Sequence, residues 1–246
     1  MDKLRTAKYK IERGRYLKQA IHRVDYFSGV FPYEFDLLAS KRKEFKAKPL
    51  DFYYGKVDFF IPEKPSTEIK QNKKDIIIGN SANESNNHLD VLDMLSSIAI
   101  EDNARIIIPL SYGGSAKYKD AVRNKAEAIV PGRVLALTSF LPFDEYISLI
   151  SNCKVAIFAH ERQQASDNVF LQLYYGARVY MSENSLAFHY LKSIGLKVFS
   201  LQRELELINS EMPEEDIMHN RQVLSDCYSG VKLIERVHRI NNTLLS

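Results

Sequence analysis

The stretch IIIGNSANESNNH, residues 76–88, changes abruptly from large apolar to small polar side chains. Its three isoleucines are typical of a buried strand, whereas Ala82 is the only apolar side chain after Gly79. A plain surface turn needs far fewer small polar residues than this segment contains. The stretch therefore predicts a buried strand that ends at a loop with a function of its own.

From Asp75 onward, short β-branched runs alternate with longer amphipathic stretches, which is the pattern of parallel strands joined by crossover helices. The predicted strands are residues 75–79, 104–110, 133–138, 154–160, 178–182 and 197–201. The predicted helices are about residues 87–100, 115–128, 143–152, 167–176, 184–194, 213–227 and 229–243. This alternation predicts an α/β fold with one Rossmann-like parallel sheet.

The sequence before Asp75 has a different character. A basic helical region comes first, LDFYYGKVDFFIP (50–62) predicts a strand pair or one long strand, and a polar segment follows. We expect three regions: an incomplete amino-terminal domain over residues 1–62, a linker over 63–74, and the parallel-sheet domain with carboxyl-terminal helices over 75–246.

The composition is that of a soluble globular protein, with 45% hydrophobic and 26% charged residues in a chain of 246. Cys153 and Cys227 offer neither a disulfide framework nor a metal-ligand spacing, and the six histidines are scattered, so no metal site is predicted. No apolar run approaches the roughly 18 residues of a membrane span, and the amino terminus lacks the apolar core of a signal peptide.

The basic charge is concentrated at the front of the chain, where residues 1–48 hold 13 Lys and Arg against 6 Asp and Glu. Such a segment could contact anionic lipid headgroups or nucleic acid. The apolar residues of its first 23 positions do not line one helical face, which favours an ordinary solvated helix. We predict no nucleic-acid partner and leave a peripheral contact with an anionic membrane open.

Ligands of open parallel sheets bind at the carboxyl ends of the strands, so the loops that follow the strands are candidate sites. In the first loop, Gly79 permits a sharp turn, and Ser85 or Asn86 can cap the helix that carries His88. The loop has a single glycine and no GK[ST] sequence, which argues against a dinucleotide fingerprint and against a P-loop.

Two further loops carry polar or glycine-rich sequence. PLSYGGSAKY (109–118) permits a close approach of backbone to ligand at its two glycines, or a simple turn. AHERQQASDN (159–168) supplies the planar cation of Arg162, and Ser166 or Asp167 can cap the next helix. This combination suits the binding of a diphosphate, but it is also typical of a surface loop with a capping box. Three such loops at one sheet edge favour a nucleotide-sugar site.

Four segments together resemble a known family. They are IIIGNSANESNNH (76–88), IIIPLSYGG (106–114), LPFDEYISLISNC (141–153) and FAHERQQASDNVFLQLYYGARVYMSENS (158–185). In order and spacing they are similar to the carboxyl-terminal half of the TDP-N-acetylfucosamine:lipid II N-acetylfucosaminyltransferases, the 4-alpha-L-fucosyltransferase family. The resemblance extends from about residue 50 to about residue 200, and the combination of GNS, SNNH, LPFDEY and RQQ is specific to it.

The resemblance implies a GT-B glycosyltransferase, in which two Rossmann-like domains face each other across a cleft and the carboxyl-terminal one holds the donor. It implies an inverting hexosyltransferase that uses neither a metal nor a cofactor. The implied reaction moves N-acetylfucosamine from a TDP-sugar to a polyprenyl-diphosphate-linked glycan during assembly of enterobacterial common antigen. The implied place is the cytoplasmic face of the bacterial inner membrane.

Site residues follow from the same resemblance. Arg162, with the helix amino terminus behind it, would stabilise the leaving TDP. The implied donor-binding residues are Gly79, Asn80, Ser81, Asn86, His88, Tyr112, Gly113, Phe140, Leu141, Gln163, Gln164, Ser166 and Asn168. Many GT-B enzymes hold the ribose with a glutamate five residues before the glycine that ends the donor helix. Leu171 stands there in this chain, so we expect Gln172 or Asn168 to take that role.

The catalytic base is not assigned by the sequence, because GT-B enzymes usually take it from the amino-terminal domain. His22, Asp25 and Glu34 are the nearby candidates, and structural roles are favoured for all three. The alternative to an active enzyme is a truncated, non-catalytic module that binds a nucleotide-sugar or a partner protein.

Overall fold

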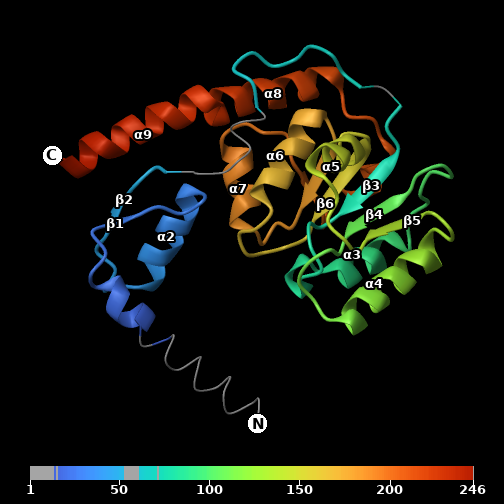
Figure 1. Cartoon of the computed structure of the whole chain (residues 1–246), viewed down its shortest axis with the longest axis horizontal. Coiled ribbons are helices and arrows are strands. Elements are labelled where there is room, and N and C mark those ends of the chain that lie inside the picture. The colour runs from blue at the N-terminus through green and yellow to red at the C-terminus, as the bar shows by residue number, and fades with distance from the viewer. Residues whose placement is uncertain (1–13, 15, 53–60, 71, 246) are drawn as a thin grey trace, which may run out of the picture. The chain divides into compact units, whose positions relative to one another are not determined.

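The computed structural model describes residues 14, 16–52, 61–70 and 72–245. The chain divides into two compact units, a large one of Gly55–Leu233 and a small one that joins Met1–Tyr54 to Ile234–Ser246. Figure 1 shows the helices and strands of both. The predicted domain limits at residues 62 and 75 stay a prediction.

The large unit is built on a six-stranded parallel sheet with the order β5-β4-β3-β6-β7-β8. Its strands are β3 (Asp75–Ile78), β4 (Ile106–Pro109), β5 (Val134–Leu137), β6 (Cys153–Phe158), β7 (Arg178–Met181) and β8 (Phe199–Ser200). All six predicted strands are confirmed. The chain runs outward from β3 to β5, then returns to the centre with β6, so the switch in strand order falls between β3 and β6.

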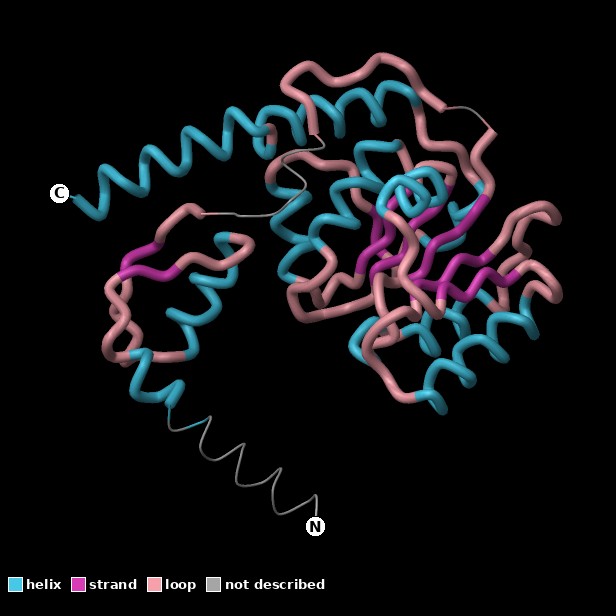
Figure 2. Tube along the Cα trace, viewed as in Figure 1, coloured by secondary structure: helices cyan, strands magenta, loops and turns pink. Residues whose placement is uncertain are grey.

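In the described part of this unit, six α-helices and two 3₁₀ turns surround the sheet. They are η2 (Glu84–Asn86), α3 (His88–Leu95), α4 (Ala116–Ile129), α5 (Phe143–Ile150), α6 (Ser166–Tyr175), α7 (Leu186–Ser193), η3 (Leu205–Asn209) and α8 (Glu214–Tyr228). Figure 2 shows helices on both sides of the strands. Each predicted helix of this unit exists, but α3 ends at Leu95 rather than residue 100, because Ser96 and Ser97 bond back to carbonyls of its last turn.

The core explains why the strands have so few polar residues. Every residue of β3, β4, β6 and β7 is buried, because helices cover both faces of the sheet. On one face, Val91 and Leu95 of α3 and Val122 of α4 pack in the cluster that contains Ile76 and Ile108. On the other, α6 contacts β6 and β7 and packs against α8.

Arg221 of α8 holds residues 61–70 against the large unit. Its Nη1 donates to the carbonyl oxygens of Ser66 (2.6 Å) and Glu68 (2.8 Å), and its Nε donates to the carbonyl oxygen of Tyr174 (2.8 Å). A buried guanidinium with three carbonyl partners satisfies backbone groups that have no strand to pair with. The segment predicted as a linker is thus fastened along the side of α6 and α8.

The small unit contains the parallel pair of β1 (Tyr26–Phe27) and β2 (Lys48–Pro49), together with α2 (Pro32–Lys41). Its apolar centre includes the contacting rings of Phe27, Phe35 and Phe45. The strand predicted over residues 50–62 and the basic helix of the first residues lie mostly outside the described residues. Among the helices that the structure describes, none is long and apolar enough to span a bilayer.

The last helix, α9 (Gly230–Leu245), begins in the large unit and continues in the small one. Within the small unit, Arg239 donates to the Asp51 carboxylate (3.2 Å), and Arg236 lies 3.6 Å from the same carboxylate. The chain therefore crosses from one unit to the other twice, near residues 54 and 234.

Candidate functional site

Gly79 stands where β3 ends, and no other residue fits there. Its φ is +68°, a left-handed conformation that favours glycine, and its N–H donates to the carbonyl oxygen of Ile157 (2.9 Å) on β6. A Cβ at this position would lie 2.7 Å from His88 Nε2 and 3.0 Å from Asn86 Oδ1. The backbone at the end of the central strand therefore lies directly on two polar side chains.

The side chains of Asn86 and His88 lie between the loop and the protein interior. Asn86 is fully buried, and its Nδ2 donates to the carbonyl oxygens of Ser81 (3.0 Å) and Asn83 (3.2 Å). His88 is fully buried as well, with Nδ1 3.0 Å from the hydroxyl of Tyr118. The sequence placed both in the donor site; the structure brings them to the loop but covers them, while Asn80 stays at the surface side of the loop.

Capping in this loop differs from the expectation. Asn83 caps η2 by accepting from the N–H of Ser85 (3.1 Å), and the residue before α3 is Asn87, which has a left-handed backbone and no side-chain cap. The prediction that Ser85 or Asn86 caps α3 is wrong, because the 3₁₀ turn occupies those positions. Asn87 Nδ2 instead donates to the carbonyl oxygen of Ala159 (2.8 Å), which ties the loop to the end of β6.

His88 makes the stability of the protein depend on pH. Burial lowers its pKa to about 4, so on acidification the unfolded chain, with an ordinary pKa of roughly 6.5, takes up the proton first. The contribution of neutral His88 to stability is complete above pH 6.5 and is lost as the pH falls toward 4, by up to about 3 kcal/mol. Urea unfolding at pH 7 and pH 4.5 measures this loss.

The matched variants for this test are His88→Gln and His189→Gln. His189 is exposed, and its substitution is the control for the pH dependence of the unfolding free energy. His88→Gln should reduce it without abolishing it, because burial also lowers the pKa of His160 to about 4. A pH dependence in His88→Gln equal to that of the unchanged protein would contradict this account.

The loop after β4 packs on the loop after β3 through its two glycines. The carbonyl oxygen of Tyr112 accepts from the N–H of Ala82 (2.8 Å). A Cβ on Gly114 would lie 2.2 Å from the carbonyl oxygen of Ala82, and one on Gly113 would lie 3.2 Å from the nitrogen of Asn83. The two glycines let the loops after β3 and β4 approach each other closely, whereas the predicted approach of their backbone to a ligand stays a prediction.

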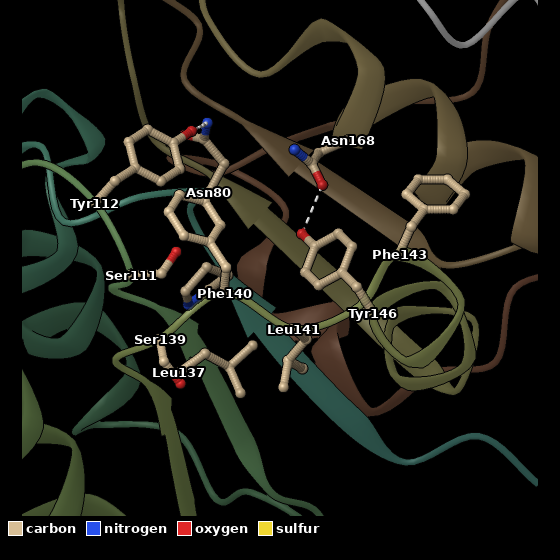
Figure 3. Close-up of a pocket in the computed structure, with 11 residues that line it drawn as sticks. Asn80, Ser111, Tyr112, Leu137, Ser139, Phe140, Leu141, Phe143, Tyr146 and Asn168 are labelled. Atoms are coloured by element: carbon tan, nitrogen blue, oxygen red, sulfur yellow. Dashed lines mark hydrogen bonds between the residues drawn. The ribbon is translucent and has the colours of Figure 1, made fainter.

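A pocket of about 260 Å³ opens beside these loops, at the carboxyl ends of β3, β4 and β5 (Figure 3). Its lining is mostly aromatic and aliphatic, with a few polar groups, as is usual for a small-molecule site. The lining residues are Asn80, Pro109, Ser111, Tyr112, Leu137, Ser139, Phe140, Leu141, Phe143, Tyr146 and Asn168. Of the predicted donor residues, Asn80, Tyr112, Phe140, Leu141 and Asn168 meet here.

Two exposed aromatic rings stand at this pocket. Tyr112 and Phe140 are nearly parallel, with an interplanar angle of 7° and ring centroids 5.8 Å apart, and 75% of Phe140 is exposed. The Tyr112 hydroxyl accepts from Asn80 Nδ2 (3.1 Å). This hydrogen bond connects the loop after β3 to the Tyr112 side chain in the loop after β4. Flat apolar faces in this position suit a planar ring of a ligand.

Asn168 is held in the pocket by a partner that the sequence did not single out. The Tyr146 hydroxyl donates to Asn168 Oδ1 (2.6 Å), as Figure 3 shows, and burial raises the pKa of this phenol so that it stays protonated. Gln172, the alternative for ribose recognition, is buried and donates to the carbonyl oxygen of Ile150 (3.2 Å). That half of the expectation is wrong, and Asn168 is the one of the two that lines the pocket.

Arg162 lies in the loop between β6 and α6, and its guanidinium is exposed. Its Nε donates to the Ser85 hydroxyl (3.0 Å), across from the loop after β3. Gln163 and Gln164 follow it with half-buried side chains. Helix α6 begins at Ser166 after Ala165, whose φ is +59° and which provides no side-chain cap, so the predicted capping by Ser166 or Asp167 is wrong.

Sequence reasoning missed several residues of the site. Ser85 and Tyr146 belong to the motifs SNNH and LPFDEY, but neither was named as a site residue, and Ser85 was considered only as a helix cap. The spacing of Tyr146 in α5 is that of a core residue, so only the motif pointed to it. Among the described residues, no group of three or more His, Cys, Asp or Glu side chains is arranged to hold a metal ion.

Solved structures with a similar fold include several glycosyltransferases. A glycosyltransferase from Rickettsia africae has a TM-score of 0.68 at 12% identity, over 94% of this chain and 66% of that one. Sucrose-phosphate synthase from Thermosynechococcus elongatus also has 0.68, at 10% identity, over 93% and 60%. The pneumococcal O-GlcNAc transferase in complex with UDP and GlcNAc has 0.62, at 12%, over 90% and 46%.

The sheet order and these structures show the fold, which is α/β of the GT-B glycosyltransferase type, as expected. The chain belongs to the family described as 4-alpha-L-fucosyltransferase, glycosyl transferase group 56, whose model matches residues 16–223. The resemblance seen in the sequence is confirmed. The chain spans between 46% and 66% of the length of the three structures compared.

Proposed function

We propose that this chain binds a TDP-activated deoxyamino sugar resembling N-acetylfucosamine and transfers the sugar to a polyprenyl-diphosphate-linked glycan, as in enterobacterial common antigen synthesis. The observation that carries the proposal is the pocket at the carboxyl ends of β3, β4 and β5, with an exposed arginine at the neighbouring loop. Membership in the family supports a sugar transfer reaction. The neighbour solved with UDP and GlcNAc supports a nucleotide-sugar as the donor class.

The donor is proposed to lie across the switch point. Its base would occupy the pocket against Phe140 and Leu141, and its diphosphate would lie between Gly79 and the amino terminus of α6. The positive end of that helix dipole and the Arg162 guanidinium supply positive potential without a metal. Asn80 and Asn168 provide hydrogen bonds along the nucleoside.

The chemistry then consists of one displacement. The acceptor hydroxyl attacks the anomeric carbon, the bond from that carbon to the TDP oxygen breaks, and Arg162 with the α6 N–H groups stabilises the charge that develops on TDP. Such a displacement inverts the anomeric centre. The base that takes the hydroxyl proton is not assigned; Glu34 is used to cap α2, where its carboxylate accepts from the N–H of Phe31 (3.1 Å).

Nucleotide binding is the first test. A nucleoside diphosphate that binds the folded chain and not the unfolded one adds about 2.7 kcal/mol at a hundred times its Kd, which raises the melting temperature by several degrees. We expect TDP to raise it, and UDP to raise it less or equally. No shift with either at millimolar concentration would contradict a donor site.

A second candidate function is nucleotide-sugar binding without transfer. The chain spans only part of the length of the glycosyltransferases it resembles in fold, which is the observation that keeps this candidate. Incubation with TDP-N-acetylfucosamine and a polyprenyl-diphosphate disaccharide separates the two. A lengthened glycan supports the enzyme; nucleotide binding with intact donor and acceptor supports the binding module.

We also propose that the chain works as a peripheral protein on the inner face of the bacterial inner membrane, where its acceptor would be anchored. The positive charge of residues 1–48 supports this proposal. Reversing Lys8, Lys10, Arg13 and Arg15, which lie outside the described residues, should weaken binding to vesicles containing phosphatidylglycerol more than tenfold, at about 1 kcal/mol per charge. Reversal of four exposed basic residues of the large unit is the control: Lys70, Lys74, Lys117 and Arg123. Equal loss in both variants would contradict a specific role of the front segment.

A further inference from the structure

We propose that Ser85 and Gln164 are positioning residues that hold Arg162 in the geometry needed to bind the donor diphosphate. With Asn86 they form a chain of hydrogen bonds between two loops, here called the Ser85 relay: Asn86, Gln164, Ser85 and Arg162. The inference rests on the proposed function, because it assigns Arg162 the diphosphate as its ligand. It adds residues whose role is to orient that arginine rather than to touch the donor.

The relay is continuous. Gln164 Nε2 donates to Asn86 Oδ1 (3.1 Å), the Ser85 hydroxyl donates to Gln164 Oε1 (2.9 Å), and Arg162 Nε donates to the Ser85 hydroxyl oxygen (3.0 Å). Asn86 and Ser85 come from the turn after β3, whereas Gln164 and Arg162 come from the loop after β6. The four side chains therefore bridge the switch point.

The relay begins at a rigid end. Asn86 is fully buried, and its Nδ2 donates to the backbone carbonyl oxygens of Ser81 and Asn83. Gly79 leaves the space that the Asn86 amide occupies, since a Cβ there would lie 3.0 Å from Oδ1. A buried amide with several fixed partners has one orientation, so the first member of the relay cannot rotate.

That fixed end sets the direction of every later hydrogen bond. Because Asn86 Nδ2 is used on carbonyls, Asn86 Oδ1 can only accept, so Gln164 must present its Nε2. Gln164 Oε1 then faces Ser85 and can only accept, so the single hydroxyl hydrogen of Ser85 is donated to it. The remaining lone pairs of Ser85 can only accept, and Arg162 Nε is the donor that they meet. The buried amide thereby requires a hydrogen-bond donor at the exposed end, which is Arg162 Nε.

The terminal Nη groups of Arg162 are oriented for a ligand by this arrangement. Nε is engaged by Ser85, and among the residues that the structure describes the two Nη atoms make no further hydrogen bond. Two parallel N–H groups on one side of a planar guanidinium match two phosphate oxygens. Holding the side chain before the ligand arrives removes part of the entropy cost of ordering it on binding.

A double-mutant cycle on the full chain tests the relay. TDP is titrated calorimetrically into the unchanged protein, Ser85→Ala, Arg162→Ala and the double variant. We expect Ser85→Ala to weaken TDP binding about three- to tenfold. In the Arg162→Ala background the same serine substitution should have no further effect, because Ser85 acts through Arg162.

Two further variants distinguish positioning from general damage. Gln164→Glu keeps the shape but cannot donate to Asn86, and we expect it to weaken TDP binding at least as much as Ser85→Ala. Ser97→Ala removes an exposed hydroxyl that bonds only within its own turn, and we expect unchanged affinity. The melting temperature without ligand should be similar in Ser85→Ala and Ser97→Ala, which shows that the affinity loss is not a loss of folding.

The outcomes separate the relay from the proposed function. If Ser85→Ala weakens TDP binding equally in both backgrounds, Ser85 does not act through Arg162 and the relay is overturned, while the donor site stands. If Gln164→Glu binds as the unchanged protein does, the directional argument is wrong. If the unchanged protein binds neither TDP nor UDP, the proposed function fails and the relay falls with it.

Discussion

Arg162→Ala is expected to lower the rate of sugar transfer by about a hundredfold, the typical effect of removing one charge-stabilising group from a transition state. The reason is that Arg162 is the exposed cation at the amino terminus of α6, where charge would develop on the departing TDP. The measurement is the initial rate of transfer from TDP-N-acetylfucosamine at saturating donor and acceptor. The fall should be in kcat more than in KM.

Arg162→Lys refines this prediction. Lysine keeps the charge but has neither the Nε–H that meets Ser85 nor the planar fork, so we expect an intermediate loss of about tenfold. Arg123→Ala is the control, because Arg123 is exposed on α4 and pairs only with Asp120 of the same helix. An Arg162→Ala enzyme as fast as the Arg123→Ala enzyme would remove Arg162 from the mechanism.

Gly114→Ala is expected to destabilise the large unit by about 3 kcal/mol or more and to abolish nucleotide binding. A left-handed φ of +58° costs a residue with a Cβ about 1 kcal/mol, and the added atom would lie 2.2 Å from the carbonyl oxygen of Ala82. Two backbones would have to separate, which moves Tyr112 away from Asn80. Chemical denaturation and TDP titration measure the two effects.

Gly132→Ala is a matched control for this effect. Gly132 has a φ of +70°, but a Cβ there would meet nothing within 4 Å. The variant should therefore show only the conformational cost, about 1 kcal/mol, with TDP affinity unchanged. If the two alanine variants are equally stable, the contact between the loops after β3 and β4 does not contribute what the geometry indicates.

The parallel sheet was predictable because its strands are short apolar runs buried on both faces. Isoleucines of β3 and β4 carry that signal, and the glycine after β3 marks where the strand ends. The loops of the site followed from the same pattern, since ligands collect at the carboxyl ends of parallel strands. Phe140 and Asn168 were assigned to the site by the resemblance to the family, and both lie in segments that follow a strand.

The sequence could not distinguish polar residues that face a ligand from those that support the loop. Asn80 and Asn86 are the same residue type six positions apart, yet one lines the pocket and the other is buried beneath the loop. Asn86 belongs to the turn η2, whereas Asn80 lies before it, and the residue type does not reveal that difference. The two-residue strands β1 and β2 were beyond prediction for another reason, because a run of two has no period.

The hydrogen bond between Ser85 and Gln164 joins residues 79 positions apart in the chain. Closing a long loop costs conformational entropy before the contact at its ends contributes any favourable free energy. We therefore expect this hydrogen bond to form only after the intervening strands have assembled and β6 has paired with β3. The proposed diphosphate site therefore has no local precursor in the unfolded chain. During refolding, the capacity to bind TDP should emerge with the last kinetic phase of the large unit, and nucleotide should slow unfolding without accelerating folding.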